Sequence, residues 1–251
     1  MGFADLCLKL KIRYGSRKSQ ELLEYLLSQI QKTGWQTSIE LGAEKGVFPE
    51  YEANKQAYQE FFKTFDICYC EYPSALHEKG ICTDYAELKP RNYEVTTIAP
   101  TGTISLVAET SSGIEPNFSW GYFRRDTVGE RYYVHPLAAE ALGIEVDLTD
   151  EASVREAALM VVENQANLPS YFVTANELTA EEHVRLLAAA QRHVDNSISK
   201  TCNGSADDTV ESVDRLYRLA RELGCKAISY YRDGSRQGQV LTALAAKEGK
   251  K

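Results

Sequence analysis

The chain has 251 residues, of which 43% are hydrophobic and 25% are charged, an ordinary composition for a globular protein. Its 36 acidic residues outnumber the 28 basic ones, and the net charge of −8 argues against bulk binding to nucleic acid or an anionic membrane. No apolar run reaches the roughly 18 residues of a transmembrane helix, and the first residues lack the basic region of a signal peptide. We therefore expect a cytoplasmic protein whose six cysteines are reduced.

The N-terminal third has the periodicity of helices. Apolar residues recur at helical spacing from Leu22 to Ile30. A second helix is expected near residues 37–45, with Gly46 as its C-cap, and a third over about residues 55–65.

Residues 67–92 are predicted to be irregular, because prolines and a glycine interrupt any period. Cys68, Cys70 and Cys82 lie in this stretch, and with His77 they are a weak candidate for a zinc site. The spacing fits no standard zinc template, so ordinary free thiols are the favoured interpretation and no metal ligand is assigned.

A β-branched run from Val95 to Ile98 predicts a strand that ends before Pro100. The next residues indicate a tight turn and the start of a helix. Glycine lets a ligand approach the backbone, hydroxyl groups can donate hydrogen bonds, and the first amide groups of a helix attract anions. The segment is therefore a candidate phosphate site, with plain helix capping as the alternative: Thr101, Gly102, Thr103, Ile104 and Ser105. A Walker A loop is excluded because no Gly-Lys-Ser/Thr is present.

The remaining sequence alternates between predicted helices and strands. Strand–helix–strand order implies parallel pairing, so the fold class is α/β. The expected helices cover residues 135–142, 152–164, 179–194 and 210–223, and the expected strands cover 197–201 and 226–231. The residues after Leu241 are expected to form a frayed tail.

Several further groups are expected to have structural roles. The basic cluster of Arg124, Arg125 and Arg131 is interpreted as a solvated loop, with nucleotide contact as the alternative. We expect buried structural thiols at Cys202 and Cys225, and packing on opposite strand faces by Tyr230 and Tyr231, with a tyrosine radical relay as the less favoured alternative. His183 and His193 share a predicted helix but lie too far apart for joint metal ligation.

Four stretches, in this order, resemble class II ribonucleotide reductases, the adenosylcobalamin-dependent type. They are GFAD at residues 2–5, TTIAPTGTIS with SSGIEP within 96–116, DNSISKT at 195–201, and GCKAISYYRDGSR at 224–236. Together they extend over almost the whole chain.

The resemblance implies a helical N-terminal third followed by the C-terminal part of a ten-stranded α/β barrel, over residues 1–240, with residues 241–251 as the tail. It implies that Thr101–Ser105 hold the substrate phosphates, and that Glu115 and Asn117 have structural loop roles. The family reduces the 2′-hydroxyl of a ribonucleotide through a thiyl radical. No catalytic residue carries over to this chain.

The chain also departs from the family pattern. Its sequence has no Asn-x-Cys-x-Glu finger loop, the nearest stretch being Cys68-Tyr69-Cys70-Glu71, and it lacks the family's reducing and C-terminal-tail cysteines. The resemblance therefore implies part of a split ribonucleoside-diphosphate reductase that is inactive alone. The expected partners are an N-terminal reductase chain, a ribonucleotide, an external thiol reductant and the adenosylcobalamin of the complete enzyme. The alternative is a non-catalytic nucleotide-binding or regulatory paralogue.

Overall fold

The computed structural model describes residues 1–67, 85, 88–126, 129–235 and 241–244. The helices are α1 (Phe3–Lys9), α2 (Arg17–Lys45), α3 (Tyr51–Thr64), α4 (Gly102–Val107), α5 (Pro136–Leu142), α6 (Glu151–Glu163), α7 (Ala180–Gln191) and α8 (Val210–Glu222), with short 3-10 turns η2 (Gln165–Asn167) and η3 (Ala175–Glu177). The strands are β1 (Gly121–Asp126), β2 (Gly129–Val134), β3 (Thr201–Gly204), β4 (Ser229–Arg232) and β5 (Leu241–Ala243).

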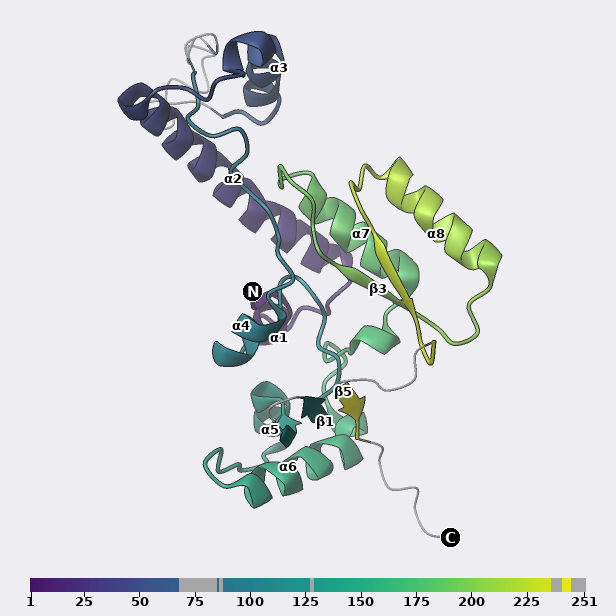
Figure 1. Ribbon diagram of the computed structural model, residues 1–251. Helices are drawn as coiled ribbons and strands as arrows, with labels where there is room; N and C mark the ends of the chain where they lie inside the picture. Colours follow the sequence, from purple (N-terminus) through teal and green to yellow (C-terminus); the bar gives the residue numbers. More distant parts are fainter. Residues whose placement is uncertain (68–84, 86–87, 127–128, 236–240, 245–251) are drawn as a thin grey trace.

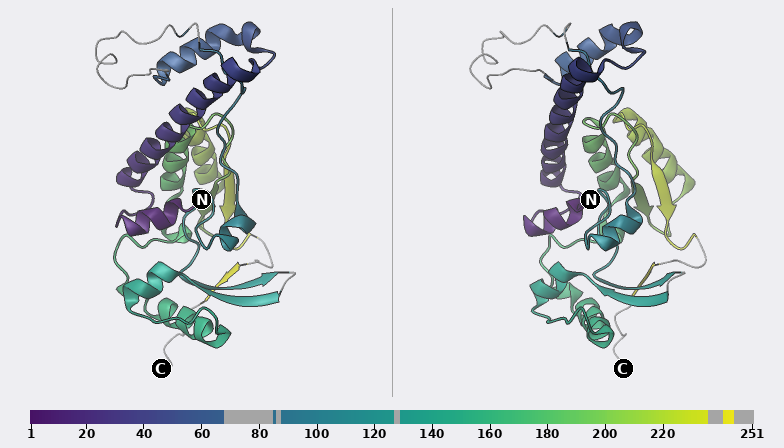
Figure 2. Two further views of the ribbon diagram at one scale, coloured as in Figure 1. Left: turned by 90° about the vertical axis from the view of Figure 1, so that its left-hand side faces the viewer. Right: turned by 60° about the vertical axis from the view of Figure 1, so that its left-hand side comes forward.

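The molecule is elongated, with three groups of elements along its length (Figures 1 and 2). At one end α3 packs on the far half of α2, around the buried Trp35 and Phe62. In the middle, α7 and α8 lie on one face of the β3–β4 pair. At the other end, α5 and α6 pack against the sheet with strand order β2-β1-β5. No described helix is both long and apolar enough to cross a membrane.

The two helices expected within residues 22–45 are a single helix, α2, of 29 residues. The sequence between them contains no proline that would break the helix. Gly34 leaves room for the side chain of Val95, which lies 3.3 Å from where a Cβ would be. Ser16 begins the helix by accepting a hydrogen bond from the Ser19 amide, and Gly46 ends it with φ 85°. The third expected helix is confirmed as α3, which begins at Tyr51 rather than near residue 55.

The α/β prediction is confirmed in the middle of the molecule. β3 and β4 pair in parallel with Cys202 opposite Tyr230, and α8 connects them. Both strands begin a few residues after the expected positions. The capping box of Thr179 and Glu182 begins α7 as predicted. Within the described residues the parallel sheet has two strands, so the expected ten-stranded barrel is not closed.

Two predictions about loops were wrong. The basic cluster lies on an antiparallel hairpin, β1–β2, in which Arg124 is opposite Arg131. The signal was present as two aromatic pairs, Tyr122-Phe123 and Tyr132-Tyr133, whose rings contact each other across the two strands. Residues 241–243, expected to be frayed, form β5 and extend the same sheet by pairing with β1.

The candidate zinc cysteines Cys68, Cys70 and Cys82, together with His77, lie outside the described residues. Within the described residues, no group of three or more His, Cys, Asp or Glu side chains is arranged to hold a metal ion.

Candidate functional site

The segment that leads to the candidate phosphate site is not the predicted strand. Among residues 95–98 only Ile98 forms a β-bridge, with Ile198. The amides of Val95 and Thr96 instead donate to Oδ2 of Asp195, at 3.0 and 3.1 Å. A side-chain carboxylate has therefore taken the hydrogen bonds that a strand ladder would have used.

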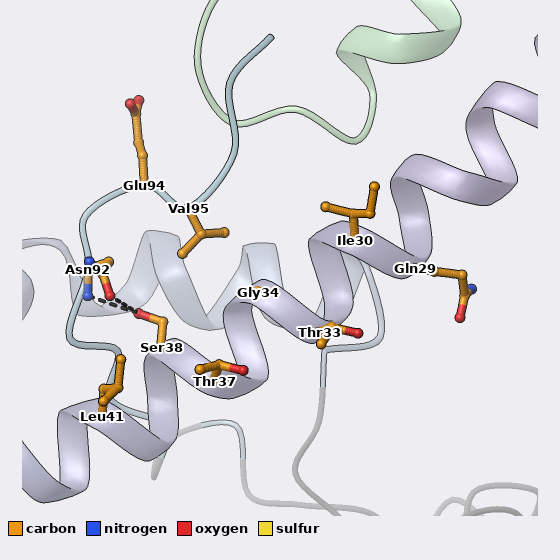
Figure 3. A pocket seen from close by; sticks show the side chains of 10 residues that line it. All are labelled: Gln29, Ile30, Thr33, Gly34, Thr37, Ser38, Leu41, Asn92, Glu94 and Val95. Carbon is orange, nitrogen blue, oxygen red and sulfur yellow. Dashed lines mark hydrogen bonds between the residues drawn. The ribbon is translucent and has the colours of Figure 1, made fainter. Parts of the chain in front are cut away.

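The segment also lies along α2 (Figure 3). The Ser38 hydroxyl accepts from the Asn92 amide at 2.9 Å and donates to Asn92 Oδ1 at 3.0 Å. Beside these contacts is an open groove of about 620 Å³, lined mainly by α2 residues.

Thr101 turns the chain from this extended segment into α4. Its φ is 52°, the left-handed region that a β-branched residue rarely adopts. The hydroxyl oxygen of Thr101 accepts a hydrogen bond from the Gly113 amide at 2.8 Å, so the two ends of the loop around α4 are joined. That contact helps to hold Thr101 in its strained conformation.

The five predicted phosphate-binding residues lie together on the first turn of α4, but their environments differ. Gly102, Thr103 and Ile104 are exposed. Ser105 is buried, and its hydroxyl donates to the Gly102 carbonyl at 3.1 Å. The first amide groups of a helix have no partner within the helix, so the exposed part of the turn offers hydrogen-bond donors to an anion.

Asp5, in the GFAD stretch, holds the chain just after α4. Its Oδ2 accepts from the Ser111 amide at 2.7 Å and from the Thr110 hydroxyl at 2.9 Å. Its Oδ1 lies 3.1 Å from Nε2 of His135, at the start of α5, and 3.4 Å from Nδ2 of Asn117. Although burial opposes ionisation, these hydrogen bonds lower the pKa of Asp5 to about 2.

Lys200, in the DNSISKT stretch, is buried behind the same loop. Its Nζ lies 3.1 Å from Oε2 of Glu115 and 3.1 Å from Nδ1 of His183. Glu115 Oε1 also accepts from the Thr201 amide at 2.6 Å. The expected structural role of Glu115 is therefore supported by its contacts, since it joins the loop after α4 to the start of β3.

His183 completes this buried cluster as a neutral base. Burial, followed by the nearby charge of Lys200, lowers the pKa of His183 to about 3. Its Nε2 lies 3.2 Å from the Ala175 carbonyl, so the hydrogen bonds assign the proton to Nε2 and leave Nδ1 to accept from Lys200. His193 lies beyond the end of α7 and contacts Gln31 instead, so the two histidines are separate as expected.

The other residues singled out in the sequence pack in the core around α7 and α8. Cys202 is fully buried and burial raises the pKa of its thiol to about 11, while Cys225 is half-buried. Tyr230 packs beside them and donates its hydroxyl hydrogen bond to Asp208. Tyr231 follows it in β4, where the pleat directs successive side chains to opposite faces.

Sequence reasoning marked the stretches containing Asp5, Asp195 and Lys200 but missed what these side chains do. For Asp5 and Lys200 an available signal was a charged residue close to apolar neighbours, because such a residue is buried only when it is paired. Asp195 lies in a largely polar stretch, which carries no such signal.

Comparison with known proteins supports the resemblance. Residues 1–231 match the family described as ribonucleotide reductase, barrel domain. The chain is 37% identical to the vitamin B12-dependent ribonucleoside-diphosphate reductase of Thermoplasma acidophilum, over 100% of the chain and 30% of that protein. It is 33% identical to the protein of the same name from Mycobacterium tuberculosis, over 98% of the chain and 32% of that protein. The chain thus spans about a third of the length of these relatives.

A solved structure has a similar fold. The class Id ribonucleotide reductase alpha subunit of Actinobacillus ureae matches with a TM-score of 0.56 and 18% identity, over 93% of this chain and 38% of that one.

The Asp5 cluster generates a prediction about acid stability. A lowered pKa means that Asp5 contributes stability above its unfolded-state value of 3.8, and that this contribution is lost as the pH falls towards about 2. We expect Asp5→Asn to lower the free energy of unfolding by about 1–2 kcal/mol at pH 7, after allowing for solvent screening, and by less at pH 2. Urea unfolding at both pH values measures this. The control is Asp214→Asn, which removes an exposed carboxylate of α8. If Asp5→Asn lowered the free energy of unfolding equally at both pH values, the lowered pKa of Asp5 would be contradicted.

The Lys200 cluster generates a second prediction. Lys200→Met leaves the partly buried Glu115 carboxylate without its cation and should lower the free energy of unfolding by about 3 kcal/mol. Adding Glu115→Gln should recover part of that loss. Arg218→Met, which breaks an exposed pair on α8, should change stability by less than about 1 kcal/mol. Denaturant unfolding of the parent and the three variants measures these differences, and a Lys200→Met chain as stable as the parent would show that the pair is not needed.

Proposed function

This chain belongs to the ribonucleotide reductase barrel-domain family, and we propose that it supplies the substrate-phosphate loop of an adenosylcobalamin-dependent ribonucleoside-diphosphate reductase. In this proposal Thr101, Gly102, Thr103, Ile104 and Ser105 hold the phosphates of a ribonucleotide whose 2′-hydroxyl is reduced elsewhere in the complete cytoplasmic enzyme.

The observation that supports the proposal most directly is the open space beside Gly102. A Cβ built on Gly102 would meet nothing within 4 Å, and its φ lies outside the left-handed region. Neither packing nor backbone conformation therefore requires glycine at the first position of α4, and glycine has more conformational freedom to lose on folding than any other residue. A ligand that approaches the backbone amides closely explains why the position is left without a side chain.

The residues of the loop have different parts in this scheme. The exposed amides at the start of α4 and the exposed hydroxyl of Thr103 donate hydrogen bonds to phosphate oxygens. The Thr101 hydroxyl oxygen is held by Gly113, so its hydrogen can point to the ligand. Ser105 stabilises the turn, because its hydroxyl donates a hydrogen bond to the Gly102 carbonyl.

We propose that radical chemistry comes from outside this chain. The finger-loop cysteine and the reducing thiols belong to an N-terminal reductase part, and electrons come from an external thiol. The β3–β4 sheet is only two strands wide in the described residues, and strands of that N-terminal part would complete the barrel.

Adenosylcobalamin, bound in the complete enzyme, would supply the radical chemistry. Within the described residues, the open groove over α2 is lined by small, polar and aliphatic side chains and contains no histidine to ligate a metal. This groove therefore does not fit a corrin.

Replacing Gly102 tests the phosphate proposal. Gly102→Ala should leave the chain as stable as before or stabilise it by up to about 1 kcal/mol, yet raise KM for the ribonucleoside diphosphate at least about tenfold in the complete enzyme. Val107→Ala is the matched control, because Val107 ends the same helix and is 83% exposed. Unchanged KM for Gly102→Ala would remove the main support for the phosphate site.

Reconstitution tests the proposal that this chain binds the substrate phosphates while an N-terminal reductase part supplies the radical chemistry. The chain alone should form no deoxyribonucleotide, and adding an N-terminal reductase part with a thiol reductant and adenosylcobalamin should restore activity. The control is the same mixture with the partner's finger-loop cysteine changed to serine, which should be inactive. Tight nucleotide binding by the chain alone, with no activity in any mixture, would favour the non-catalytic paralogue instead.

A further inference from the structure

We propose that Asp195 is a positioning residue for the substrate phosphates: its carboxylate fixes the segment before the phosphate loop and thereby places the amides of that loop. The inference rests on the proposed function, because it assumes that residues 101–105 bind the phosphates.

The carboxylate of Asp195 is shared between two parts of the fold. Oδ2 accepts from the consecutive amides of Val95 and Thr96, at 3.0 and 3.1 Å. Oδ1 accepts from Nε1 of Trp35 at 3.2 Å, and Trp35 is 2% exposed in the core between α2 and α3. Asp195 therefore ties the segment to a side chain that has no room to move.

Further hydrogen bonds fix which residues of the segment before the phosphate loop lie opposite residues 195–199. The Asp195 amide donates to the Thr96 hydroxyl at 2.9 Å, and the Asn196 amide donates to the Thr96 carbonyl at 3.1 Å. The Ser199 amide donates to the Ile98 carbonyl at 2.9 Å. A shift of one residue along this segment would break all of these bonds together.

The chain between this attachment and the phosphate loop is too short to absorb a displacement. Only Ala99 and Pro100 lie between Ile98 and Thr101, and the proline ring fixes one of the intervening dihedrals. Thr101 itself is held in its strained turn. A displacement at Thr96 is therefore passed on to the amides of Gly102 and Thr103.

The change Asp195→Asn tests this role with little change of shape. An amide oxygen can still accept from the Val95 and Thr96 amides, but the NH₂ group then faces the Trp35 N–H, so two donors meet. We expect the segment to shift and the phosphate-binding amides to lose their alignment, while the nucleoside contacts made by the rest of the enzyme remain.

The readout is the contribution of the phosphates to affinity in the complete enzyme. Dissociation constants are measured for a ribonucleoside diphosphate and for the same nucleoside without phosphates. Asp195→Asn should weaken diphosphate binding about tenfold or more and nucleoside binding less than about twofold, with KM rising more than kcat falls. A general loss of folding would reduce both affinities alike, so equal weakening of the two ligands overturns the proposal.

Two further variants keep the test decisive. Thr96→Val removes the hydroxyl that accepts from the Asp195 amide and should weaken diphosphate binding selectively but less strongly, which decides the matter if Asp195→Asn does not fold. Asp150→Asn is the matched control, because Asp150 also accepts from two backbone amides, at 3.3 and 3.1 Å, but at the start of α6. It should change neither affinity.

The Gly102→Ala variant separates the two hypotheses. If Gly102→Ala leaves diphosphate binding unchanged, the phosphate site itself is wrong. If Gly102→Ala weakens diphosphate binding while Asp195→Asn and Thr96→Val do not, the phosphate site stands and the positioning role of Asp195 is overturned.

Discussion

Carboxylate side chains, rather than regular strand pairing, hold the long connection that contains the proposed phosphate loop, residues 101–105. Asp195 accepts amides at its beginning, Asp5 accepts one just after α4, and Glu115 accepts the amide of Thr201 near its end. Between these points the chain forms one β-bridge and one short helix. Hydrogen bonds to a charged acceptor are stronger than those between neutral groups, so a few carboxylates can fix an irregular path. The loop can then depart from strand geometry at Thr101 without the connection losing its place.

The buried charges serve the same arrangement. Taking Lys200 and its partner Glu115 out of water is unfavourable, and replacing both by hydrophobic side chains of similar volume would often be at least as stable. What the lysine adds is a unique geometry, because its ammonium is satisfied only when Glu115 and the neutral His183 both face it. The depressed pKa of His183 is part of this arrangement, since a protonated imidazole beside Lys200 would place two positive charges together. We infer that the cluster specifies where the loop after α4 meets β3.

The parts of the fold that the sequence predicted best are those decided by local signals. The capping box of α7 and the strand–helix–strand order around α8 depend on neighbouring residues, and both were predictable. The segment from Val95 to Ile98 has strand-forming residues, yet its amides go to a side chain a hundred positions away. The hairpin of β1 and β2 was missed because its arginines suggested solvent exposure, although each strand contains a pair of aromatic residues. The turn at Thr101 and the start of α4 were located correctly in the sequence, but the side chains that hold them come from distant stretches that no local pattern connects.

These contacts join three of the four stretches of family resemblance to one another. GFAD supplies Asp5, SSGIEP supplies Gly113 and Glu115, and DNSISKT supplies Asp195 and Lys200. Each of the three contacts TTIAPTGTIS or the residues next to it, so the path of the phosphate loop is determined by residues of this chain. The radical chemistry that we assign to the complete enzyme needs a cysteine loop that these residues do not provide. In the function that we propose, substrate placement therefore depends on contacts within this chain, whereas radical generation needs residues that the chain does not contain.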